Sequence, residues 1–123
     1  MIPRTTSLLI PLLALILAIQ AQAQKSISAA AAKDHVGEKA TVCGEVASAH
    51  FAARSRGTPT FINLEKPYPN QIFTVLIWGS DRPKFGSPER EYDGKRICVT
   101  GKVNIYRGMP EIIAYEPSQI SMQ

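Results

Sequence analysis

Five short segments of this 123-residue chain carry strand patterns, and glycine or proline punctuates the gaps between them. The segments span residues 39–49, 60–65, 72–78, 95–105 and 110–115. Alternating apolar and polar residues indicate strands with one buried face, whereas 72–78 is apolar on both faces except for Thr74, which is typical of a central strand. Five short strands, with a longer connection after the third, predict an all-β fold, a small Greek-key barrel. A β-sandwich is the alternative, but it usually needs about seven strands.

The N-terminus has a separate pattern. Arg4 precedes an apolar run over 8–19 that only Pro11 interrupts, and the run is followed by Ala21-Gln-Ala23. A basic start, a short apolar core and an Ala-x-Ala end predict a secretory signal peptide over residues 1–23. An uncleaved anchor is the alternative, but this run is shorter than the roughly 20 residues that span a bilayer. Cleavage after Ala23 lowers the net charge from +4 to +3, because Arg4 is removed.

Export changes the interpretation of Cys43 and Cys98, which are the chain's two cysteines. An even cysteine count in an oxidising compartment favours a disulfide. Each cysteine lies in a similar segment with a central glycine, 41–46 (TVCGEV) or 98–103 (CVTGKV), on the parity opposite the valines. The first and fourth strands of a five-stranded barrel are neighbours, so we expect the two cysteines to meet on its outer face.

A short N-terminal segment, 24–37, precedes the strands. Residues 24–27 are expected to form a frayed start, Ser28 can cap a helix that runs to about Asp34, and Gly37 can end that helix. The predicted organisation is therefore a signal peptide over 1–23, this segment, and one domain over 38–120.

The chain resembles an OB-fold domain of the bacterial nucleic-acid-binding type, related to anticodon-binding and helicase-associated OB domains. The resemblance covers roughly 38–120. The residues that carry it are 42–46 (VCGEV), 61–65 (FINLE), 72–77 (IFTVLI), 94–103 (GKRICVTGKV), 106–112 (YRGMPEI) and 116–120 (EPSQI). OB-folds bind nucleic acids, oligosaccharides and proteins, so the resemblance implies a binding function more directly than it implies a ligand.

The resemblance places the ligand face on the second and third strands, between the first and last hairpin loops. Phe61 stands where related anticodon-binding domains have an aromatic residue that faces the cleft. If Phe61 points outward, so does Asn63, and Ile62 and Leu64 face the core. On the next strand, Phe73, Val75 and Ile77 form a core set, with Thr74 and Trp78 outward. An exposed aromatic can stack on bases; alternatively, Phe61 and Trp78 fill the ends of the barrel.

Basic residues occupy both flanking loops: Arg54 and Arg56 in the first, and Arg107 beside Tyr106 in the last. Arginine neutralises phosphates and stacks on bases, and Lys66, Arg82 and Lys84 could widen the basic rim. The alternative is a charged loop that serves solubility. The residues predicted to bind nucleic acid are Arg54, Arg56, Phe61, Asn63, Lys66, Thr74, Trp78, Tyr106 and Arg107.

The leading hypothesis is an exported protein, periplasmic or secreted, that binds single-stranded nucleic acid, DNA or RNA, through this face. The alternative is a periplasmic module for a small molecule, glycan or protein partner, without nucleic-acid binding. No cofactor, metal site or enzyme activity is expected, because no nucleotide-binding or catalytic motif occurs and His35 and His50 lack a catalytic constellation. A nuclease using Asp81, Arg82 and Glu45 is a third hypothesis that no motif supports.

Overall fold

The computed structural model describes residue 3 and residues 25–123. Apart from Pro3, the predicted signal peptide lies outside the described residues. No helix among these residues is long and apolar enough to cross a membrane. The strands are β1 (Ile27–Ser28), β2 (Lys39–Phe51), β3 (Thr60–Leu64), β4 (Phe73–Ile77), β5 (Arg96–Tyr106), β6 (Met109–Ile113) and β7 (Ile120–Met122). The helices are two 3₁₀ turns, η1 (Ala29–Asp34) and η2 (Pro117–Gln119), and the short α1 (Arg82–Phe85) and α2 (Pro88–Glu91).

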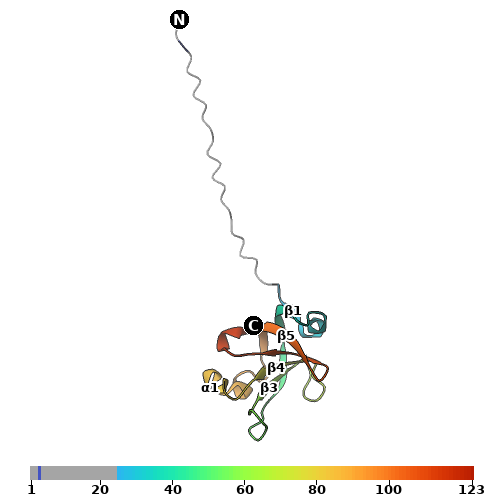
Figure 1. Cartoon of the computed structure of the whole chain (residues 1–123), viewed down its shortest axis with the longest axis vertical. Coiled ribbons are helices and arrows are strands. Elements are labelled where there is room, and N and C mark those ends of the chain that lie inside the picture. The colour runs from blue at the N-terminus through green and yellow to red at the C-terminus, as the bar shows by residue number, and fades with distance from the viewer. Residues whose placement is uncertain (1–2, 4–24) are drawn as a thin grey trace.

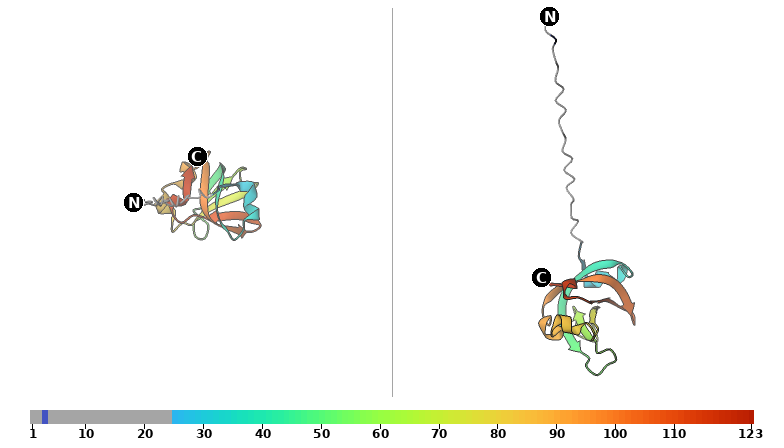
Figure 2. Two further views of the ribbon diagram at one scale, coloured as in Figure 1. Left: turned by 90° about the horizontal axis from the view of Figure 1, so that it is seen from above. Right: turned by 60° about the vertical axis from the view of Figure 1, so that its left-hand side comes forward.

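The seven strands form one sheet in the order β1-β2-β3-β4-β6-β5-β7, and β2 also pairs with β5. The second pairing closes β2, β3, β4, β6 and β5 into a ring of five strands, which curls around a common interior (Figures 1 and 2). The expectation of a mostly β chain with five principal strands is confirmed, and so is the expected contact between the first and fourth of them.

The interior of the ring is filled by the residues whose parity predicted burial. Ile62 and Leu64 on β3 and Phe73, Val75 and Ile77 on β4 are all fully buried. Val42 and Val46 on β2 meet them from the neighbouring strand. Burying this apolar surface is the main favourable contribution to folding, at about 25 cal/mol per Å².

The predicted disulfide is present. Cys43 on β2 and Cys98 on β5 are directly opposite in the antiparallel pairing and are bonded to each other. Two residues along, the Thr41 and Thr100 hydroxyls form a hydrogen bond of 2.8 Å on the same face. We call Thr41, Cys43, Cys98 and Thr100 the outer row. The outer row holds together β2 and β5, the two strands that close the ring.

The chain ends differ from the expectation. Ile27, placed in a frayed start, instead belongs to β1 and pairs in parallel with Val42. At the other end β7 pairs with β5, which the sequence pattern did not predict. Strands of two or three residues have too little sequence for a visible alternation, and they form because β2 and β5 offer free backbone groups at their outer edges. The Ser28 cap does form, since its hydroxyl accepts a hydrogen bond from the Ala31 amide at 3.2 Å.

The last hairpin turn spans residues 106–109. Tyr106 pairs with Met109, so only Arg107 and Gly108 lie between the strands. Both have positive φ, 50° and 78° respectively. Two central residues with positive φ give the turn twist that suits an antiparallel hairpin.

A register shift lies between Val46 and Ser48 in the pairing of β2 with β3. Before the shift, even-numbered residues such as Val42 and Val46 face the core. After it, Ser48 pairs with Asn63 and Ala49 pairs with the core residue Ile62. A bulge reverses the side to which later residues point, because the side-chain period of a strand is two. Ser48 and His50 therefore point away from the core.

Candidate binding cleft

A cleft of about 680 Å³ lies on the outer side of β3 and β4. It extends from the end of β2 to the β5–β6 hairpin, and the loop between β3 and β4 forms part of its wall. We call it the cleft. Its lining residues are Ser48, His50, Ala52, Ser55, Phe61, Asn63, Tyr68, Gln71, Thr74, Tyr106, Arg107, Met109 and Glu111.

A row of four polar residues crosses the cleft, one from each of four neighbouring strands. Ser48 pairs with Asn63, Asn63 with Thr74, and Thr74 with Glu111. Paired residues point to the same face of a sheet, so these four side chains lie side by side. We call Ser48, Asn63, Thr74 and Glu111 the polar row.

Hydrogen bonds connect the first three members of the polar row. The Asn63 side-chain nitrogen donates to Ser48 Oγ at 3.1 Å, and the Thr74 hydroxyl donates to Asn63 Oδ1 at 3.1 Å. The Tyr68 amide also donates to Ser48 Oγ at 3.1 Å, which ties the β3–β4 loop to β2. With both ends of its amide used, Asn63 is held in one orientation on the cleft floor.

Glu111 ends the polar row. It is 9% exposed, and the described residues form no hydrogen bond or ion pair with its carboxylate. Burial is the one cause that raises the pKa of this carboxyl above its ordinary value. The cleft therefore holds a partly desolvated carboxyl group without a hydrogen-bond partner among the described residues, which disfavours its charged form.

Aromatic side chains surround the polar row. Phe61 is half-buried on β3, whereas Tyr68 on the β3–β4 loop and Tyr106 on the β5–β6 hairpin are 73% and 56% exposed. The Arg107 guanidinium lies 5.3 Å from the centre of the Tyr106 ring. Flat apolar surfaces beside a cation form a surface on which a planar ligand can stack.

The cleft brings together some of the residues that the sequence analysis selected. Phe61, Asn63, Thr74, Tyr106 and Arg107 all line it. Asn63 and Thr74 are on the expected side of their strands but are 2% and 5% exposed, so a ligand could reach them only from within the cleft.

The other selected residues lie outside the cleft lining: Arg54, Arg56, Lys66 and Trp78. Arg54 and Arg56 are exposed in the loop between β2 and β3, to which the lining residue Ser55 also belongs. The Trp78 ring instead covers Gly57 of that loop, where a side chain would come within 2.9 Å of it. Trp78 therefore packs against the loop backbone, and glycine is required beneath it.

Two basic residues that were expected to widen the rim are paired within the protein. Arg82 forms a 2.6 Å ion pair with Glu89 and lies 3.8 Å from the centre of the Phe51 ring. Lys84 lies 2.9 Å from Glu116 and also contacts Asp81. These ion pairs offset both positive charges, so Arg82 and Lys84 add little to a basic field around the cleft.

Sequence reasoning missed part of the lining. Ser48 and His50 followed the core parity of β2, and only the bulge turns them into the cleft. Glu111 was not among the residues selected from the sequence. Its position between Pro110 and Ile112, within an apolar strand, was the available signal of burial. Tyr68 and Gln71 sit in a loop, where no side-chain periodicity applies.

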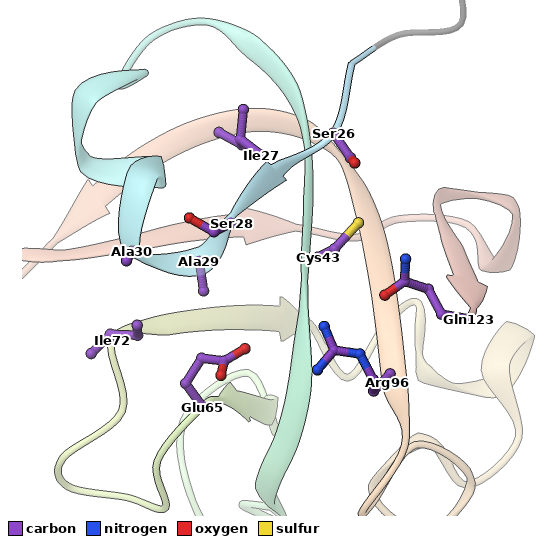
Figure 3. A pocket seen from close by; sticks show the side chains of 10 residues that line it. All are labelled: Ser26, Ile27, Ser28, Ala29, Ala30, Cys43, Glu65, Ile72, Arg96 and Gln123. Atoms are coloured by element: carbon purple, nitrogen blue, oxygen red, sulfur yellow. The ribbon is translucent and has the colours of Figure 1, made fainter.

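A second pocket of about 440 Å³ lies beside the disulfide, between β1 and the chain end. Figure 3 shows Ser28 and Ala29 on one side of Cys43, and Arg96 and Gln123 on the other. The Glu65 carboxylate in this pocket accepts a hydrogen bond from the Glu45 amide at 3.0 Å. This acid is therefore already used to hold β3 against β2, and the pocket is the weaker candidate for a binding site.

Residues 25–123 contain no group of three or more histidine, cysteine, aspartate or glutamate side chains that could hold a metal ion. The cleft combines aromatic surfaces, the Arg107 guanidinium and the polar row. This arrangement is suited to stacking and hydrogen bonding.

No protein-family model and no curated protein matches the chain. Solved structures do. A putative aspartyl-tRNA synthetase from Leishmania major Friedlin aligns with a TM-score of 0.54 and 12% identity, over 85% of this chain and 22% of that one. The aspartyl-tRNA synthetase from Entamoeba histolytica aligns with a TM-score of 0.51 and 15% identity, over 83% and 22%.

The OBody AM1L10, in its complex with hen egg-white lysozyme, aligns with a TM-score of 0.51 and 17% identity, over 73% of this chain and 83% of that one. The chain thus spans about a fifth of the length of each synthetase and most of the OBody. Likeness at this identity shows a shared fold and carries no function with it.

Proposed function

We propose that this chain is an exported OB-fold protein that binds single-stranded nucleic acid in the cleft. The fold assignment is supported by the ring of five strands, in the order β2-β3-β4-β6-β5, and by the likeness to two aspartyl-tRNA synthetase chains. The observation that carries the proposal is the convergence of Phe61, Tyr68 and Tyr106, with Arg107, on one concave face.

This combination has a direct chemical use. Each exposed ring can stack on a base, because every base has a π-face, and such stacking contributes about 1–3 kcal/mol per base. Arg107 can neutralise a phosphate that passes the hairpin, and Arg54 and Arg56 can do so from the other flanking loop. Bound in this way, the single-stranded nucleic acid would lie across β3 and β4 with its bases toward the sheet.

Export is part of the proposal. It is supported by the signal-peptide pattern over 1–23 and by the disulfide, since disulfides persist in oxidising compartments. A periplasmic or secreted location follows from the same features.

A second candidate is a module for a non-nucleic ligand, such as a small molecule, glycan or protein partner. It is favoured by the mixed charge of the cleft, because Glu111 lies on the floor and only one arginine lines the wall. A sugar hydroxyl or an amine could satisfy the unpaired carboxyl.

Binding of a labelled single strand of about 12 nucleotides, followed by fluorescence anisotropy over a range of salt concentrations, tests the proposal. We expect the affinity to fall steeply with salt, and the double substitution Arg54→Ala, Arg56→Ala to weaken binding and reduce the salt slope by about two. Arg90→Ala, an exposed arginine on α2, is the matched control and should change neither. Absence of binding at low salt would overturn the proposal, and thermal protection by an uncharged ligand alone would favour the second candidate.

A further inference from the structure

We infer that Glu111 makes the cleft selective for bases that carry an exocyclic amino group, so that cytosine binds in preference to uracil. The inference rests on the proposed function, because it specifies which bases of a bound nucleic-acid strand the cleft would prefer. It is carried by the direction of the hydrogen bonds in the polar row.

The polar row has a donor end and an acceptor end. A threonine hydroxyl carries one proton, and the Thr74 proton is directed to Asn63 Oδ1. Thr74 therefore presents only lone pairs to its other neighbour, Glu111. An ionised carboxylate also has only lone pairs, so no hydrogen bond can form between these paired residues.

The remaining neighbours do not supply a donor. Asn104 of β5 lies opposite Glu111 in the antiparallel pairing, but no hydrogen bond joins their side chains. Gln71, another residue of the cleft, also has an acceptor, Oε1, that finds no partner among the described residues. The Gln71 oxygen is itself fully buried, so Glu111 is the acceptor that a ligand could satisfy by bringing a donor.

The bases differ in the donors that they can bring. Cytosine, adenine and guanine carry an amino group, and carboxylate side chains accept from the cytosine amino group in protein–DNA complexes. Uracil and thymine carry no amino group, and their ring N–H lies between two carbonyl oxygens that would repel a carboxylate. A carboxylate on the cleft floor therefore favours the amino-bearing bases.

The position of Glu111 relative to the stacking surface fits this role. Phe61 on β3 and Glu111 on β6 share one face of the sheet and are separated by the single strand β4. The two residues are offset by two inter-strand spacings, about 10 Å, and by two residues along the strands, about 7 Å, so a base stacked beside Phe61 can reach toward the carboxylate. The ring would supply stacking for any base, and the carboxylate would then distinguish among bases.

The experiment compares oligo-deoxycytidine with oligo-deoxyuridine of equal length, at one salt concentration, by fluorescence anisotropy. We expect the wild-type protein to bind the cytosine strand about tenfold more tightly, because hydrogen bonds to charged groups are stronger than neutral ones. Glu111→Gln should reduce this ratio to within about twofold, because it weakens the hydrogen bond to cytosine and removes the repulsion of the uracil carbonyl oxygens. Glu91→Gln, an exposed carboxylate on α2, should keep the full ratio.

A second measurement needs no variant of the protein. Replacing cytosine by N4,N4-dimethylcytosine removes both amino donors, and the wild-type protein should then lose about tenfold in affinity. Equal affinity for the two strands, or a preference that survives Glu111→Gln, would overturn the inference while leaving nucleic-acid binding intact. If neither strand binds at low salt, it is the proposed function that fails.

Discussion

Thr74 and Asn63 face each other on β4 and β3, and the Thr74 hydroxyl donates to Asn63 Oδ1 at 3.1 Å. The two side chains are almost completely buried, so their hydrogen bond forms out of reach of bulk water. This single contact orients Asn63 toward Ser48 and leaves Glu111 without a donor. The character of the cleft floor depends on it.

Replacing Thr74 with valine tests this contact. The substitution keeps the shape but removes the donor, so Asn63 Oδ1 becomes a buried acceptor without a partner. We expect a loss of about 1–3 kcal/mol in the free energy of unfolding, measured with urea. Thr100→Val removes a hydrogen bond of the half-exposed outer row and should have a smaller effect, because water can replace the lost partner. Equal losses in the two variants would contradict this account.

The buried carboxyl of Glu111 makes the stability of the protein depend on pH. Its pKa is raised by burial in the folded state, and its paired neighbours Thr74 and Asn104 are uncharged. Its contribution to stability is therefore complete below the ordinary pKa of glutamic acid and is lost as pH rises through the raised value. We expect Glu111→Gln to be more stable than the wild type at neutral pH, with a difference that shrinks on acidification.

Urea unfolding of both proteins between about pH 4 and pH 7.5 measures that difference. The control is Glu91→Gln, which removes an exposed carboxylate and should follow the wild-type profile. A difference that stays constant over this range would show that the Glu111 carboxyl is not perturbed.

Phe61 is predicted to stack on a base. Phe61→Ala should therefore weaken binding of a single strand by about 1–3 kcal/mol while the salt dependence stays unchanged, since no charge is removed. Tyr115→Ala is the control, because Tyr115 is 52% exposed and lies outside the cleft lining. Anisotropy titrations of the two variants make the comparison, and equal affinities would show that Phe61 does not contact the ligand.

The disulfide should contribute strongly to stability. Cys43 and Cys98 are 55 residues apart, and a cross-link of that span restricts the unfolded chain by about 4 kcal/mol in the chain-entropy account. We expect the double variant Cys43→Ser, Cys98→Ser to unfold at a much lower urea concentration than the wild type. Reductant should destabilise the wild type and leave the double variant unaffected; a wild-type midpoint that reductant does not change would contradict the prediction.

The core and the closure of the ring could be predicted from the sequence because they follow local periodicity. Ile62 and Leu64 alternate with Phe61 and Asn63, so the two faces of β3 were evident before any pairing was known. The cysteines share the outward parity of their strands, which made their meeting predictable. The burial of Asn63 on the outward face was not predictable in the same way, because it depends on the neighbours that β2 and β4 bring to it.

The cleft was only partly predictable, because two of its determinants are not local. The bulge after Val46 has no marker in the sequence of β2, yet it decides that Ser48 and His50 face the ligand side. The arginines of the first loop were selected by charge and position, whereas the cleft wall is formed largely by uncharged side chains. Pairing and loop packing, which involve residues far apart in the chain, decided both outcomes.

By itself the sequence determined that this chain forms a β structure, since apolar side chains at every second position can be buried together on one face only by strands. It also determined that a disulfide could join two of these strands on their outer face, since both cysteines have the outward parity. The tertiary structure alone decided which polar residues share the cleft floor. Ser48, Asn63, Thr74 and Glu111 come from four strands, and only their pairing aligns them in one row. Whether Glu111 has a donor depends on the direction of a hydrogen bond between two other residues, and this is a property of the assembled sheet.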